Sequence, residues 1–116
     1  GIHSEMIGVE LECECDPDRN RSAIALQVTT AFQEITDTRN FMMIKHDSSL
    51  SNGFEIVSTT ATLSVHNYVW NKFLTLVQNA IHNKLTSHEY KRFGLLSHLR
   101  SFRDFEGRRT CGIHVH

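Results

Sequence analysis

The chain has little of what marks disorder, repeats or membrane insertion. One proline and six glycines among 116 residues argue against a disordered or repetitive chain. No apolar run approaches the roughly 20 residues that span a bilayer, and no signal-peptide pattern opens the chain. The formal net charge is only −1, so no overall field attracts the chain to nucleic acid or anionic lipid. These absences predict one globular cytoplasmic domain with neither a membrane nor a nucleic-acid partner.

Several common site motifs are also missing. No phosphate-binding loop, dinucleotide glycine pattern or nucleophile elbow occurs. The three cysteines are an odd number, and Cys13 and Cys15 share one face of one predicted strand. This pattern indicates reduced thiols in a reducing compartment. Their parity, with that of Cys111, favours buried thiols, and a structural zinc site is the alternative. The eight histidines are the one compositional sign of site chemistry.

The stretch Met6–Cys15 alternates with period two, which predicts a strand. One face carries Gly8 followed by Glu10, Glu12 and Glu14. Residues on the other face are apolar and can pack into a core. Carboxylates about 7 Å apart along one face repel one another unless water, a cation or a basic ligand neutralises them. The strand therefore predicts either a solvated acidic face or a binding site.

Two later strands repeat the same layout, a glycine followed two residues on by a ligand-type side chain. In Gly53–Ser58 the side chain is Glu55, and in Cys111–His116 it is a histidine. If the three strands are neighbours, one surface gathers the side chains of Glu10, Glu12, Glu55, His114 and His116. Carboxylates suit Mg²⁺ or Mn²⁺, while the two imidazoles leave Zn²⁺ or Ni²⁺ open.

Helices and a short strand fill the rest of the chain. Asp16–Asp18 predicts a helix entry, because Asp can cap and Pro can occupy the first turn. An apolar stripe at helical spacing follows, made of Ile24, Val28, Ala31, Phe32 and Ile35. Asp37–Asn40 ends that helix, Phe41–Ile44 is expected to be a buried strand, and 47–53 suits a hairpin turn.

The clearest helix is Thr62–Lys84. Its apolar stripe consists of His66, Trp70, Phe73, Val77 and Ile81, at steps of three and four residues. We expect His66 to be a hydrogen-bonded packing residue rather than a ligand. Thr86 and Glu89 then have the capping-box spacing.

A basic segment follows the helices, with arginines at 100, 103, 108 and 109 around Gly107. It is expected to be a solvated connection or a phosphate clamp, because guanidinium groups match phosphate oxygens.

Five short motifs, in chain order, resemble the amidoligase family of carboxylate–amine ligases, which is related to glutamine synthetase and glutamate–cysteine ligase and is often found in phages and bacterial gene clusters. The motifs are Gly8-x-Glu10-x-Glu12, Asp47-x-Ser49, Gly53–Ser58, Thr62-Leu63 with His66, and Cys111–His116. The match spans nearly the whole chain. The resemblance implies an α+β fold whose antiparallel sheet has helices packed on one face and holds ATP and Mg²⁺ on its concave face, as in glutamine synthetase.

The resemblance also implies roles for individual residues. Glu10, Glu12 and Glu55 would hold the metal ions, and His114 or His116 would complete the metal shell or touch the nucleotide. Further cofactor-binding positions are Gly8, Asp47 and Ser49. Arg108 and Arg109 would join the glutamates in catalysis, since phosphoryl transfer needs charge neutralisation.

The implied reaction joins a carboxylate and an amine, from small molecules or peptides, through an acyl phosphate. Family members usually continue beyond the His-x-His strand. We therefore expect residues 1–116 to form a single incomplete domain that corresponds to the N-terminal half of an amidoligase domain. Either a homo-oligomer or a second chain could complete the site.

Two other functions stay open. His114-Val115-His116 also fits the His-hydrophobic-His pattern of metal-dependent endonucleases, with Tyr68 or Tyr90 as nucleophile. A non-catalytic domain that binds a metal or a partner through the acidic face is the other alternative.

Overall fold

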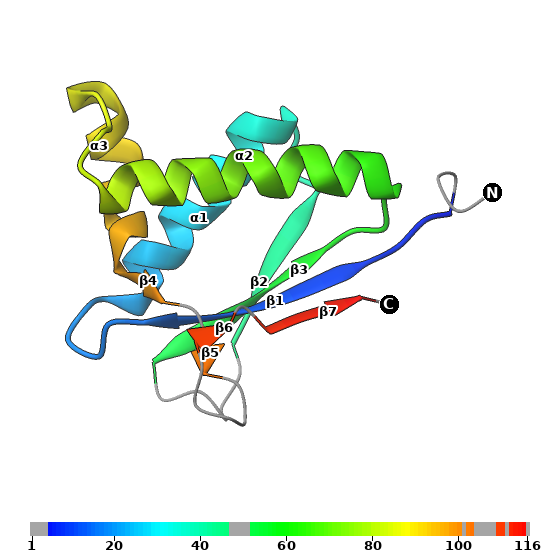
Figure 1. The fold of residues 1–116 in the computed structure, drawn as a ribbon, viewed down its shortest axis with the longest axis horizontal. Helices are drawn as coiled ribbons and strands as arrows, with labels where there is room; N and C mark the ends of the chain where they lie inside the picture. The colour runs from blue at the N-terminus through cyan, green and yellow to red at the C-terminus, as the bar shows by residue number, and fades with distance from the viewer. Residues whose placement is uncertain (1–4, 47–51, 101, 104–108, 111, 116) are drawn as a thin grey trace.

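The computed structural model describes residues 5–46 and 52–100, and the backbone alone at 102–103, 109–110 and 112–115. Within these ranges the chain forms one five-stranded antiparallel sheet, and helices lie along one of its faces (Figure 1). This confirms the predicted α+β class with helices on one face. The sheet consists of β1 (Val9–Cys15), β2 (Met42–Lys45), β3 (Gly53–Ser58), β4 (Leu99–Arg100) and β7 (Gly112–Val115).

Strand β1 lies at the centre of the sheet. The order is β2–β3–β1, and both β4 and β7 pair with the other edge of β1. β7 pairs with the first part of β1, from Val9 to Glu12, and β4 pairs with its last two residues. β3 and β7, the two later strands with the predicted glycine layout, therefore lie on either side of β1. The predicted binding surface needs this arrangement.

Helix α1 (Arg21–Thr36) begins later than predicted. Its cap is Asn20, whose side chain accepts a hydrogen bond from the Ala23 amide at 3.1 Å. The prediction that Asp16–Asp18 begin the helix was wrong, because the Asp16 carboxylate is used elsewhere. It forms an ion pair with Arg100 and lies 3.2 Å from His98 Nδ1.

Helix α2 (Leu63–Ile81) matches the predicted span closely. Thr62 caps it by accepting from the Val65 amide at 3.4 Å. His66 and Phe73 are buried as expected, but Ile81, its last residue, is 52% exposed. Val69, which the predicted stripe did not include, is also buried.

The remaining elements are short. α3 (Ser87–Phe93) begins with the predicted capping box, formed in both directions between Thr86 and Glu89. A 3-10 helix, η2 (Gly94–His98), continues the chain to β4. Part of the predicted basic loop is a separate two-stranded antiparallel sheet of β5 (Phe102–Arg103) and β6 (Arg109–Thr110).

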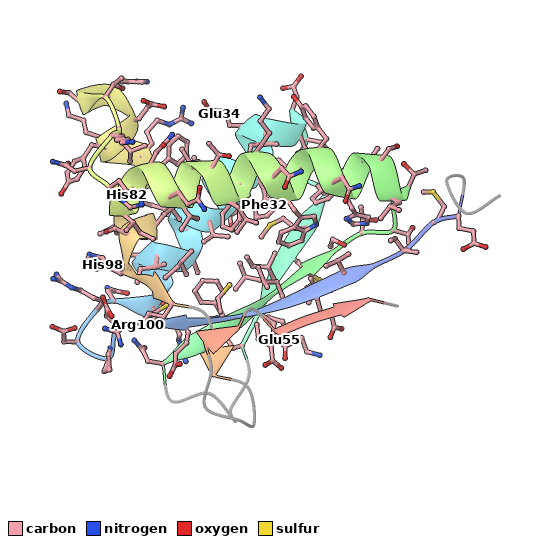
Figure 2. All side chains as sticks on the ribbon, in the orientation of Figure 1. Phe32, Glu34, Glu55, His82, His98 and Arg100 are labelled. Carbon is pink, nitrogen blue, oxygen red and sulfur yellow. The ribbon has the colours of Figure 1, made fainter. Side chains whose placement is uncertain are left out.

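The core lies between the helices and one face of the sheet. β1 contributes Leu11, Cys13 and Cys15, and β3 contributes Phe54 and Ile56, all at most 5% exposed. Phe32 of α1 stacks on Phe73 at 4.5 Å between ring centroids, and Figure 2 shows Phe32 between α2 and the sheet. Burial of each such side chain contributes about 1.5–3 kcal/mol. This burial fixes which face of the sheet is covered.

Strand β2 is not the buried strand that the apolar run predicted. It lies at the edge of the sheet order, and its residues alternate between half-buried and exposed. Met43 is 62% exposed, because alternate residues of β2 face away from the helices. Among the described helices, none has the length and apolar character needed to cross a membrane.

Candidate functional site

The sheet face that points away from the helices, called here the open face, carries the acidic side chains of β1. Alternation along β1 buries every odd-numbered residue from Val9 to Cys15 and leaves Glu10, Glu12 and Glu14 half-buried. Figure 2 shows Glu55 on the side of the sheet away from Phe32 and α2. The covered face is thus used for packing, and the open face holds the polar groups.

The central row of the open face brings two carboxylates together. Glu12 is the direct register partner of Glu55, and Glu55 is the partner of Lys45 on β2. On the other edge of β1, Gly112 is opposite Glu12. Side chains at directly opposed positions have Cβ atoms about 4.5–5.5 Å apart. Two like charges at that spacing, followed by a lysine, form a row that a cation can bridge.

The adjacent row is apolar on one side of β1. Glu10 is the register partner of Val57, and Val57 is the partner of Met43. On the other side, position 114 of β7 is opposite Glu10. The predicted adjacency of the three strands is therefore confirmed, and His114 has the register position that the site hypothesis needs.

A third row closes one end of the open face. Glu14 pairs in register with Gly53 on β3 and with Arg100 on β4. Arg100 forms its ion pair with Asp16. Asn52 also donates a hydrogen bond to the Asp16 carbonyl, at 2.7 Å. These contacts anchor the C-terminal end of β1 to β3 and β4.

The cysteines of β1 lie on the covered face. Cys13 and Cys15 are both buried, as the parity predicted, and Cys111 lies outside the described residues. Burial raises the pKa of the Cys15 thiol to about 11, while the nearby Arg21 charge acts in the opposite direction. A thiol with that pKa stays protonated at neutral pH and is a poor nucleophile or metal ligand.

Several predicted site residues cannot be placed by their side chains. Asp47, Ser49, Arg108 and His116 lie outside the described residues, and Arg109 is described only by its backbone, in β6, opposite Arg103. Gly8 is described, and among the described residues a Cβ built there would meet the Ser58 carbonyl oxygen alone, at 3.9 Å. Among the side chains that the structure describes, no three His, Cys, Asp or Glu are grouped so as to hold a metal ion.

Sequence reasoning missed one open-face residue that the register places beside the carboxylates. Lys45 follows the Phe41–Ile44 run directly, and extending the alternation of that run by one residue would have found it. Its position beside Glu55 puts a cation at the edge of the acidic row.

Comparison of the chain with protein-family models, with curated proteins and with solved structures gives no match in any of the three.

Proposed function

We propose that the protein is an ATP- and Mg²⁺-dependent carboxylate–amine ligase whose site lies on the open face. The observation that supports this best is the register that sets Glu12 opposite Glu55 and Glu10 opposite position 114. Three of the five motifs that resemble the amidoligase family include these strands. In this proposal the sheet has the glutamine-synthetase-like arrangement.

The donor chemistry fits a magnesium ion. Mg²⁺ prefers hard oxygen ligands and is usually bound through one or two carboxylates together with substrate phosphates. Glu12 and Glu55 provide two carboxylates at opposed positions, and Glu10 is two residues from Glu12 on the same face. When bound, the metal would neutralise phosphate charge.

The chain's own residues would orient the substrates and balance their charge. In the first step a carboxylate oxygen forms a bond to the γ-phosphorus of ATP, and the bond from that phosphorus to ADP breaks. In the second step an amine nitrogen bonds to the acyl carbon, phosphate leaves and the nitrogen loses a proton. Lys45, Arg108 and Arg109 supply the cationic groups that such phosphoryl transfer requires.

Isothermal titration with Mg²⁺ and a non-hydrolysable ATP analogue tests the proposal. Glu12→Gln and Glu55→Gln each keep the side-chain shape and remove one charge. We expect each to raise the Kd for the magnesium–nucleotide complex at least tenfold, which corresponds to about 1.4 kcal/mol.

Glu14→Gln is the matched control for this titration. It removes the same charge from the same strand and face, one row beyond the paired carboxylates, and should change the Kd less than twofold. Equal Kd values for the wild type and both pair variants would remove the carboxylates from the role. If the protein binds Mg²⁺ but does not bind the nucleotide analogue, the result would instead support the non-catalytic alternative.

The endonuclease alternative gains no support from the described residues. Tyr68 on α2 and Tyr90 on α3 are both exposed, and these helices lie on the covered side of the sheet (Figure 1). A tyrosine nucleophile beside β7 would have to lie in the sheet or on its open face.

A further inference from the structure

A buried histidine of α2 contacts the backbone just before the glutamates of β1. His66 is 3% exposed, and its Nε2 lies 2.7 Å from the carbonyl oxygen of Ile7. The same carbonyl accepts from the Ala61 amide at 3.0 Å. Ile7 directly precedes Gly8 and lies three residues before Glu10. The contact therefore joins α2 to the segment that leads into the proposed site.

Trp70 determines which ring nitrogen of His66 carries the proton. The indole Nε1–H of Trp70 donates to His66 Nδ1 at 3.1 Å, and an indole nitrogen can only donate. Nδ1 must then be the unprotonated acceptor, and the proton lies on Nε2. Because a carbonyl oxygen can only accept, Nε2–H donates to Ile7. The neutral imidazole thus uses both of its nitrogens, and the tautomer follows from its two partners.

Packing alone does not explain this arrangement. An apolar side chain of similar volume could fill the space beside the Phe41 ring, whose centroid is 5.7 Å from that of His66. A buried imidazole loses its hydration and is retained at low cost only when both nitrogens are paired. Both pairs are present here, one with the backbone carbonyl of Ile7 and one with the indole of Trp70.

Other contacts fix the same segment. The Ile7 amide donates to the Ala61 carbonyl at 2.8 Å, and the Val9 amide donates to Ser58 Oγ at 2.9 Å. Gly8 lies between these two anchored residues. Any shift of the segment would move the start of β1 and, with it, the position of Glu10 relative to Val57.

We propose that His66 and Trp70 act as a positioning pair that sets where Gly8 and Glu10 lie on the open face. The effect of this pair on ligand binding rests on the proposed function. Its effect on the Ile7–Val9 segment does not, so the two parts are tested by different measurements.

Amide hydrogen exchange followed by NMR tests the structural part. Trp70→Phe keeps an aromatic ring and removes the donor, so His66 loses the partner that fixes its tautomer. His66→Leu removes both bonds, whereas His66→Gln keeps a side-chain N–H that can reach the Ile7 carbonyl. We expect the Ile7, Val9 and Ala61 amides to exchange about tenfold faster in Trp70→Phe and His66→Leu, and His66→Gln to restore most of the protection.

Phe73→Leu is the matched control. Phe73 contacts Trp70 edge to face at 6.3 Å between centroids and stacks on Phe32, so its replacement disturbs the same cluster without touching the His66 bonds. Exchange rates are compared after correction for the global stability of each variant. If all the variants accelerate exchange uniformly along the chain, the pair is only part of the core and the proposal is overturned.

Two further readouts complete the test. Trp70 is the only tryptophan, so one indole N–H resonance reports its bond to His66. That resonance should shift much further in His66→Leu than in Phe73→Leu, where the change is the lost ring current of Phe73. Titration with Mg²⁺ and the ATP analogue should show at least fivefold weaker binding in His66→Leu, with Phe73→Leu close to wild type. If the wild type binds no nucleotide, the proposed function fails, and the exchange data alone decide whether the pair holds the segment.

Discussion

The two faces of strand β1 have different roles, and alternate residues of one short sequence supply them. On the covered face Leu11, Cys13 and Cys15 are at most 5% exposed and join the cluster under α1 and α2. On the open face the glutamates lie in register with Glu55 and with position 114. Period-two alternation therefore separates the residues that set stability from those that supply charge. Substitutions on the two faces should have effects of different kinds.

The largest expected effect comes from adjacent residues of β3 that point to opposite faces. Phe54 is fully buried, so Phe54→Ala should lower the free energy of unfolding by about 3–5 kcal/mol through lost burial and the cavity left behind. Glu55→Gln should change it by less than about 0.5 kcal/mol, because the relief of repulsion from Glu12 is offset by the loss of attraction to Lys45. Urea denaturation measures both. Similar losses in the two variants would contradict the division between the faces.

Burial of Cys15 on the covered face should make the free energy of unfolding depend on pH. The pKa of Cys15 is raised to about 11 from its ordinary value of 9.0. Between these values the unfolded chain releases the thiol proton and the folded chain keeps it, so stability falls as the pH rises. The loss should reach about 2 kcal/mol by pH 11, since one pKa unit corresponds to about 1.4 kcal/mol.

Comparison with Cys15→Ala isolates this contribution from other groups that titrate in the same range. The free energy of unfolding is measured from pH 8 to 11 for both proteins, and the difference between them should shrink as the pH rises. A constant difference would mean that the thiol titrates alike in the folded and unfolded chains. Replacing Glu14 by Gln should produce a much smaller change, because the Glu14 charge is the smallest of the causes that act on the pKa of Cys15.

Sequence patterns predicted which residues lie on each face of β1, because alternation is a local property. The parity of β1 separated buried from half-buried residues correctly, and the capping box at Thr86 needed only a spacing of three residues. The run Phe41–Ile44 was misjudged because four apolar residues carry no signal of whether a strand lies inside a sheet or at its edge. Lys45 was missed because the predicted strand ended at Ile44, one residue before the end of β2.

Long-range contacts explain the other errors and the unassigned roles. Asp16 looked like a helix cap because nothing nearby in the sequence reveals its contacts with His98, 82 residues away, and with Arg100. The expectation that His66 is a hydrogen-bonded packing residue was confirmed, but its partner Ile7 is 59 residues away. Sequence spacing identifies the type of group at such positions, and only the fold identifies the group it binds.

The smallest expected effect, at Gly8, gives the sharpest comparison of the two faces. Within the part of the chain that the structure describes, a Cβ at this position would meet the Ser58 carbonyl oxygen alone, at an ordinary contact distance of 3.9 Å. Gly8→Ala also reduces the freedom of the unfolded chain. We therefore expect the free energy of unfolding to stay the same or to rise by about 0.5 kcal/mol. Thermal or urea denaturation checks this value.

The same added methyl group tests whether the open face receives a ligand close to the backbone. If nucleotide lies over the start of β1, as the proposed function requires, the methyl group intrudes on it and the affinity for magnesium and the ATP analogue falls several-fold. Ser64→Ala, on the exposed first turn of α2, is the control and should leave that affinity unchanged. Unchanged stability with weakened binding would show that the glycine serves the ligand, because the fold itself has room for alanine. Unchanged binding would mean that the ligand does not approach the sheet at Gly8.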